Sequence, residues 1–212
     1  MKVAVTSGAF DDALERGDLT QHEFLDAAAR IIGCDGVVLD VRHFPRTDSD
    51  YLAQVKKMAT DLGLTIAALA GDSVFTADAT EIRALLECAL AVGAPLVAGR
   101  LAAETALSWS AQLEKLSLAS GLAKAANVTL ALRNAPGTFA ATAQDCKRVT
   151  KETDSAWLRY GLDPAAFDAG SDVESLRAKT VLLWQSEGVW TLPGWDSFRG
   201  FVVLERTELN RS

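Results

Sequence analysis

Short apolar runs alternate with amphipathic helical stretches from one end of the chain to the other. Each run is short, and most are bounded by glycine, proline or polar residues, which is the pattern of β-strands. We therefore predict eight strands, at Val3–Ser7, Gly36–Val41, Thr65–Ala70, Pro95–Gly99, Val128–Asn134, Arg159–Asp163, Thr180–Trp184 and Phe201–Glu205.

Signals for helix starts and ends lie between these runs. The segment Thr20-Gln21-His22-Glu23 is a capping box, and it opens a helix that runs to about Ile32. Gly63 and Gly93 follow later helices as C-caps. The other predicted helices run from Asp50 to about Leu62, from Asp78 to about Val92, from Trp109 to Ala126 and from Thr142 to Glu152, with a short one opening at Ser171.

The alternation of strands and helices predicts an α/β fold with parallel strands joined by crossovers. Eight such units favour a (β/α)8 TIM barrel, because open doubly wound sheets more often have about five or six strands. The open sheet stays as the alternative, although neither GxGxxG nor GxxxxGK[ST] occurs in the chain. We expect a single domain over residues 1–212.

The last two units are shorter than the others, which predicts a shortened barrel. The connection from Trp184 to Phe201 contains Gly188, Pro193 and Gly194 and has no helical period. We therefore expect the last one or two helices to be reduced or missing. A homo-oligomer would then cover the apolar outer faces of the last strands.

Side-chain alternation places charged residues inside the barrel at the ends of several strands. In the fifth strand the large apolar residues share the face suited to packing against helices, so Arg133 points inward. The same alternation directs Asp40, Asp163 and Glu205 inward, and barrel active sites are built at these strand ends. Arg133 between carboxylates predicts either ligand binding or a salt-bridge network that closes the mouth, since buried charges are paired in both cases. Three further candidates lie close by: Arg100, His43 and Asn134.

Composition and charge narrow the classes of partner. The chain is 49% apolar and 23% charged, as expected of a soluble globular protein. A net charge of −7 with scattered lysines and arginines argues against nucleic acid. No apolar run reaches the roughly 18 residues that span a bilayer, and the first residues do not form a signal peptide. Three widely spaced cysteines predict neither a disulfide framework nor a zinc site, so we expect a cytoplasmic protein without membrane contact.

Six short segments near the strands carry a family pattern. The first reads Gly-x-Asp-Gly-Val, and a later one reads Leu-x-Leu-Arg-Asn-x-x-Gly where the pattern has Glu for Arg. The segments are Gly33–Val37, Ala89–Ala94, Leu130–Gly137, Asp163–Ala166, Leu183–Glu187 and Phe198–Glu205. In this order and spacing the chain resembles the xylose isomerase-like TIM barrels, which include sugar-phosphate isomerases and epimerases, over nearly its whole length.

The resemblance implies a divalent metal held by Glu, Asp, His and Glu on strands five to eight. The metal polarises a hydroxy-carbonyl unit while the two glutamates move a proton between neighbouring carbons. This chain keeps Asp163 and Glu205 but has Arg133 on strand five and Trp184 on strand seven, and Ala166 replaces a further histidine. A guanidinium cannot ligate a cation and repels one nearby. We therefore expect Arg133 to occupy the metal position and pair with both acids, leaving no cofactor: neither manganese, magnesium nor zinc.

Three hypotheses for the function follow. In the first, the strand ends bind a sugar, polyol or sugar acid, with Arg133 and Glu205 as catalytic residues if the chain is an isomerase or epimerase. In the second, a non-catalytic relative keeps a pocket for sensing or binding. In the third, a structural protein has its mouth closed by the network of Arg133, Asp163 and Glu205.

The tryptophans and His43 each have two interpretations. Trp184, Trp190 and Trp195 offer flat faces for a sugar ring or pack as hydrophobic cover. His43 is a general acid or base, or a solvated loop histidine. Glu187 stands where the family has an aspartate. The predicted ligand contacts are therefore Asp40, His43, Arg100, Asn134, Asp163, Trp184 and Glu187.

Overall fold

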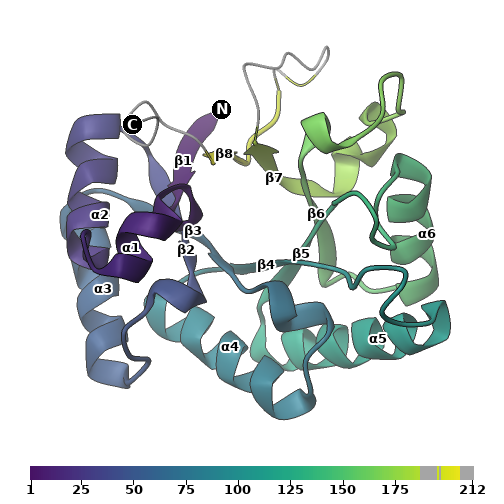
Figure 1. Cartoon of the computed structure of the whole chain (residues 1–212), viewed down its shortest axis with the longest axis horizontal. Coiled ribbons are helices and arrows are strands. Elements are labelled where there is room, and N and C mark those ends of the chain that lie inside the picture. Colours follow the sequence, from purple (N-terminus) through teal and green to yellow (C-terminus); the bar gives the residue numbers. More distant parts are fainter. Residues whose placement is uncertain (187–194, 196, 206–212) are drawn as a thin grey trace.

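Eight parallel strands close into a barrel in the order β1 to β8 (Figure 1). A computed structural model describes residues 1–186, 195 and 197–205. The strands are β1 (Lys2–Thr6), β2 (Gly36–Asp40), β3 (Thr65–Ala70), β4 (Leu96–Arg100), β5 (Thr129–Arg133), β6 (Leu158–Leu162), β7 (Thr180–Gln185) and β8 (Phe201–Leu204). Parallel pairing of β8 with β1, with Phe201 opposite Lys2, closes the ring. The barrel prediction is confirmed, and the open sheet is wrong.

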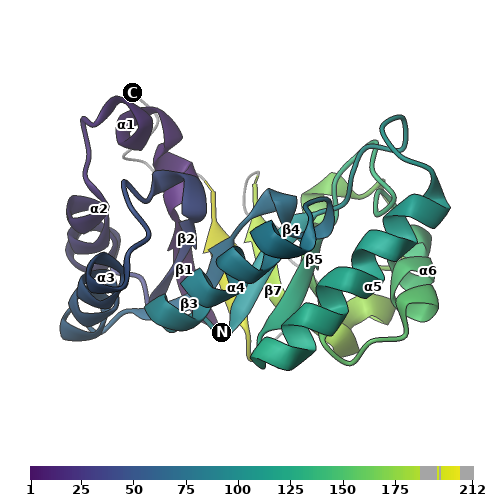
Figure 2. The same ribbon diagram turned by 90° about the horizontal axis from the view of Figure 1, so that it is seen from below.

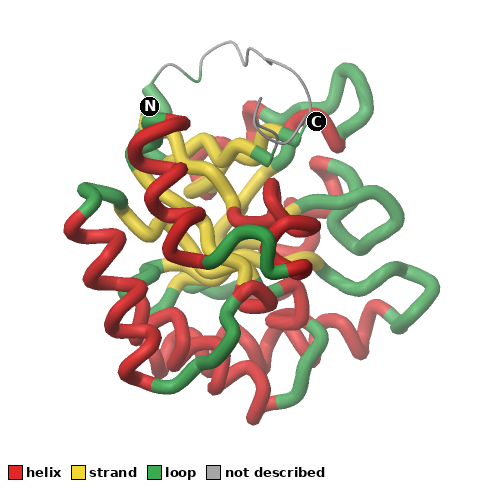
Figure 3. Tube along the Cα trace, turned by 60° about the vertical axis from the view of Figure 1, so that its left-hand side comes forward, coloured by secondary structure: helices red, strands yellow, loops and turns green. Residues whose placement is uncertain are grey.

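Helices surround the strands (Figure 3). They are α1 (Asp11–Arg16), α2 (Gln21–Ala27), α3 (Ser49–Asp61), α4 (Ala79–Val92), α5 (Trp109–Ala126) and α6 (Ala143–Thr153). The capping box of α2 is present, because Thr20 and Glu23 each accept the other's backbone N–H. Two predictions need correction: α1 was not expected, and the helix expected to open at Ser171 is a 3₁₀ helix over Glu174–Lys179. Six residues are too few to show a helical period, which explains why the sequence pattern did not predict α1.

The strands separate two apolar layers. Between strands and helices lies the main core, to which β5 contributes Leu130 and Leu132. Inside the barrel, Ala131 joins a smaller cluster that includes Trp184. The predicted alternation along the fifth strand is therefore confirmed. Gly161 on β6 makes room for Trp184, because a Cβ at this glycine would lie 3.2 Å from the indole Nε1.

The sequence predicts a loop instead of a helix between β7 and β8, and residues 187–194 of this connection lie outside the described part of the chain. The candidates Glu187 and Trp190 lie there as well. Trp195 is buried, with its ring centre 5.7 Å from that of Phe198, so it provides hydrophobic cover and no open stacking face. Among the described residues, no helix has the length and apolar character required to cross a membrane.

Because all eight strands are parallel, their C-terminal ends lie at the same end of the barrel. Figure 2 shows α1 at that end and the amino terminus at the other. We use the term rim for the residues at, and just after, the C-terminal ends of the strands.

Candidate functional site

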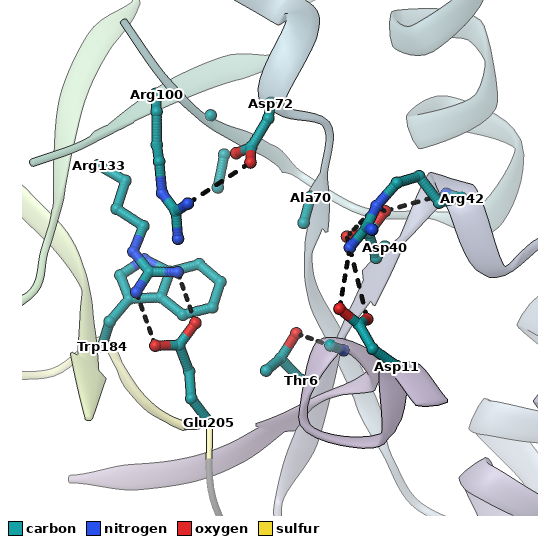
Figure 4. A pocket seen from close by; sticks show the side chains of 13 residues that line it. Thr6, Asp11, Asp40, Arg42, Ala70, Asp72, Arg100, Arg133, Trp184 and Glu205 are labelled. Atoms are coloured by element: carbon teal, nitrogen blue, oxygen red, sulfur yellow. Dashed lines mark hydrogen bonds and ion pairs between the residues drawn. The ribbon is translucent and has the colours of Figure 1, made fainter. Parts of the chain in front are cut away.

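The rim encloses a polar cavity of about 170 Å³ (Figure 4). This rim cavity is smaller than the roughly 300–1,000 Å³ of sites for drug-sized ligands, so it suits a small molecule. Five predicted site residues line it: Asp40, Arg100, Arg133, Trp184 and Glu205. Thr6, Asp11, Arg42 and Asp72 also line it and were not among the predicted site residues.

Arg133 lies at the centre of a buried ion-pair network. Its Nη1 and Nη2 donate to the two carboxylate oxygens of Glu205 at 2.5 and 2.6 Å, and Nη2 also donates to Oδ2 of Asp163 at 3.2 Å. The side chains of Arg133 and Asp163 are only 10% and 4% exposed, while Glu205 is 23% exposed. The predicted pairing is therefore present, and the fork of the guanidinium binds Glu205 in the strong bidentate geometry.

The indole of Trp184 supports this guanidinium from one side. The guanidinium carbon of Arg133 lies 4.3 Å from the centre of the Trp184 ring, within the range of a cation–π contact. Trp184 is only 2% exposed. Because Arg133 stacks against the ring, Trp184 does not offer an open stacking face to a sugar.

Asn134 fixes the position of Asp163. Its Nδ2 donates to the Asp163 carbonyl at 2.9 Å, and the Asp163 N–H donates to its Oδ1 at 2.7 Å. Asn134 is buried and does not line the rim cavity, so the structure places it between the ends of β5 and β6. Asp163 also accepts the N–H of Ala165 at 3.2 Å, and with Arg133 both of its carboxylate oxygens have partners.

Arg42 holds a second group of carboxylates on the opposite wall. It donates to Asp40 at 2.8 Å through Nη2, and it lies 3.4 Å from Asp11 and 3.5 Å from Glu15. The hydrogen bond to the Asp40 carboxylate raises the pKa of Arg42, with smaller contributions from the charges of Asp40 and Asp11. The Asp40 side chain also accepts the backbone N–H of Arg42, which starts the turn after β2.

His43 lies behind Asp11, outside the rim cavity. Its Nδ1 is 2.8 Å from Oγ of Ser7, and its Nε2 is 2.9 Å from Oδ1 of Asp11. Since Ser7 Oγ accepts the N–H of Asp40 at 2.8 Å, its own proton is free to donate to Nδ1, which fits the tautomer protonated on Nε2.

The interpretation of His43 as a solvated loop residue is wrong, because its side chain is fully buried, with Ser7 of the turn after β1 and Asp11 of α1 beside its two ring nitrogens. It lines a neighbouring cavity of about 550 Å³ together with Phe44 and Tyr51. Ser7 is fully buried, so Ser7, His43 and Asp11 do not form an accessible nucleophilic triad.

Arg100 has fewer partners than the other two arginines of the rim cavity. Its Nη1 lies 3.7 Å from Asp72, and the two side chains are 41% and 68% exposed. Within the described residues it donates no hydrogen bond, and its Nε is buried without an acceptor. Figure 4 shows its guanidinium directed into the cavity.

The donor set does not fit the divalent metal that the family resemblance implies. Asp163 and Glu205 are present, but the Arg133 guanidinium lies between them and donates hydrogen bonds to both. In the described part of the chain, no group of three or more His, Cys, Asp or Glu side chains is arranged to hold a metal ion. The Arg133 guanidinium would have to move before a cation could reach both acids.

Sequence reasoning missed four lining residues for different reasons. Thr6 follows the inward alternation of β1, and Asp72 lies two residues after the end of β3, so strand-end position was a usable signal for both. Arg42 lies in the turn after β2, beyond the strand end itself. Asp11 had no signal, because it reaches the cavity from the unpredicted α1.

The comparisons with known proteins agree with this architecture. A family model described as "Xylose isomerase-like TIM barrel" matches residues 25–183. No curated protein matches the chain.

Solved structures share the fold at low sequence identity. The probable 3-DHS dehydratase AsbF from Bacillus anthracis has a TM-score of 0.78 and 15% identity, covering 99% of this chain and 95% of that one. The 3-keto-D-glucoside 4-epimerase from E. coli has a TM-score of 0.72 and 17% identity, covering 98% and 94%. D-psicose 3-epimerase with D-tagatose from Clostridium cellulolyticum H10 has a TM-score of 0.75 and 15% identity, covering 96% and 84%. Identities this low establish the shared fold alone.

Proposed function

The chain belongs to the xylose isomerase-like TIM barrel family, and from this premise we propose that its rim cavity binds a small sugar, polyol or sugar acid without a divalent metal. One observation carries the proposal: the guanidinium of Arg133 lies between Asp163 and Glu205, beside an accessible polar cavity. The positive charge at this position is then part of the chain itself.

The lining of the rim cavity suits a ligand rich in hydroxyl groups. A hydroxyl both donates and accepts hydrogen bonds, and the cavity offers both kinds of partner. Asp11 and Asp40 supply acceptors on one wall, while Arg100 supplies donors on the other (Figure 4). The small volume favours compact molecules over extended ones.

The charge pattern favours binding over turnover. Family chemistry moves a proton between two carbons with two glutamates, whereas here strand five carries Arg133. Glu205 keeps the position of a base, but both of its oxygens already accept hydrogen bonds from Arg133. Isomerase or epimerase turnover would use Glu205 as base and Arg133 to polarise the carbonyl.

A second candidate is a non-catalytic barrel whose mouth is closed by Arg133, Asp163 and Glu205. The burial of this network favours it, because paired and buried side chains have little capacity left for a ligand. The two candidates differ in whether the cavity beside the network takes up a small molecule.

Metal analysis tests the first half of the proposal. We expect protein purified without chelator to contain far less than one equivalent of manganese, zinc or magnesium. Arg133→Glu should gain Mn²⁺ binding in electron paramagnetic resonance titrations, because three carboxylates would then converge. Arg30→Glu, on the exposed face of the helical turn after α2, is the matched control and should not gain it. Stoichiometric, tightly bound metal in the wild type would overturn the metal-free proposal.

Ligand binding tests the second half. Saturation-transfer NMR with sugars, polyols and sugar acids of three to six carbons should detect at least one binder. Ala70→Leu should abolish the signal, because the side chain of Ala70 lines the rim cavity and a larger one would fill it (Figure 4). Absence of binding across the panel would reject ligand binding in favour of the closed barrel.

A further inference from the structure

The arginines of the rim cavity differ in how far their charge is compensated. Arg133 has two carboxylate partners within 3.2 Å, and Arg42 has three within 3.5 Å. Arg100 has one, Asp72, at 3.7 Å, and that carboxylate is 68% exposed, so water screens the contact. Arg100 is therefore the arginine of the cavity whose charge is least compensated, and its terminal nitrogens keep hydrogen-bonding capacity because they donate to no described residue.

The surroundings of Arg100 keep this capacity available to a ligand. The side chain is 41% exposed and extends from the end of β4 into the rim cavity (Figure 4). Its Nε is buried, so the terminal nitrogens of the guanidinium are the donors that a ligand in the cavity can reach. An anionic group placed beside the guanidinium would improve its pairing.

The remaining walls of the cavity repel a second anionic group. Asp11 and Asp40 face the cavity from the wall opposite Arg100, and Glu205 lies beside Arg133 (Figure 4). A carboxylate is disfavoured next to these acids, whereas hydroxyl groups can donate hydrogen bonds to them. The lining thus separates one site for an anion from several sites for hydroxyls.

We propose that the ligand is a sugar acid with one carboxylate, bound with that carboxylate on Arg100 and with its hydroxyls toward Asp11 and Asp40. This inference rests on the proposed function and selects one of its three ligand classes. A phosphate is a poorer match, because its second negative charge would meet Asp72 and the acids of the opposite wall.

Matched ligand pairs provide the test, measured by titration calorimetry on the full chain. Each pair differs only in a carboxylate against a hydroxymethyl group: glycerate and glycerol, erythronate and erythritol, gluconate and glucitol. We expect at least one acid to bind roughly tenfold more tightly than its polyol, as for a charge-assisted hydrogen bond at a partly exposed site. Glycerol 3-phosphate should bind more weakly than the preferred acid, and added salt should weaken binding of the acid more than of the polyol.

Two variants separate the role of Arg100 from general charge effects. Arg100→Gln should remove the preference for the acid, so that the acid and its polyol bind with similar affinity. Arg30→Gln removes an exposed arginine paired with Asp26 and should keep the full preference. Equal binding of acid and polyol to the wild type would overturn this inference and leave the proposed function standing. Failure of all three acids to bind would also overturn it, and the proposed function would fall only if the sugars and polyols of the wider panel failed to bind as well.

Discussion

Arg133→Met tests whether the buried guanidinium holds the rim together. Methionine keeps much of the side-chain volume but removes the charge and the donors. Asp163, with a side chain only 4% exposed, would then lose its cationic partner, and Glu205 would lose both of its short hydrogen bonds. The contact of the guanidinium with the face of Trp184 would be lost as well.

The expected loss of unfolding free energy follows from burial. Removing one partner of a buried ion pair costs ~3–5 kcal/mol, and a cation–π contact adds ~1 kcal/mol. Glu205 is 23% exposed, so water can solvate its unpaired carboxylate, and the lower end of this energy range applies to the pair of Arg133 with Glu205. We expect a loss of about 3–4 kcal/mol, which is a large fraction of the ~5–15 kcal/mol of a typical domain.

Urea unfolding followed by circular dichroism measures this loss. Arg148→Met is the matched control, because Arg148 also lies 4.3 Å from a tryptophan ring and pairs with Glu152, but at an exposed site. Arg148→Met should lower the free energy of unfolding by less than ~1 kcal/mol. Adding Asp163→Asn and Glu205→Gln to Arg133→Met should recover more than half of the loss, because the orphaned charges are removed. A loss below ~1 kcal/mol for Arg133→Met would refute the reasoning that these charges depend on one another.

Three further predictions concern single positions. Gly161→Ala should lower stability by ~1–2 kcal/mol in the same urea assay, because its Cβ would crowd Trp184 inside the barrel; an unchanged midpoint would contradict this. His43→Ala should lower the free energy of unfolding by about 2 kcal/mol or more, because it leaves a cavity and deprives the buried Ser7 hydroxyl of its acceptor. His43→Asn should recover part of this loss. Burial raises the pKa of Cys146 to about 12, so little thiolate forms at pH 8. This thiol should therefore react with DTNB only after unfolding. Rapid reaction of Cys146 in the native protein would contradict this prediction.

The strands and the centre of the site were predictable because they depend on local alternation. Leu130 and Leu132 on one face of β5 fixed the inward direction of Arg133, and the structure confirms it. Asp163 and Glu205 followed from the same rule on their own strands. Their convergence on Arg133 required only that the barrel close.

The opposite wall was not predictable in the same way. Asp11 reaches the rim cavity from α1, which is too short to produce a periodic pattern. His43 contacts Ser7 across 36 residues of sequence, and nothing local to either residue indicates the pairing. Asn134 was placed at the correct strand end, but whether its amide faced a ligand or the backbone of Asp163 depended on spacing between β5 and β6 that only the structure supplies.

The position of Arg133 also changes how the rim acquires its central positive charge. A bound ion occupies its site to an extent set by its free concentration, and a chelator can remove it. The guanidinium of Arg133 is part of β5 and is therefore present once in every chain. The free energy of its ion pairs with Asp163 and Glu205 is therefore part of the free energy of folding. Assembly of this ion-pair network thereby depends on the folding of β8, which brings Glu205 to Arg133.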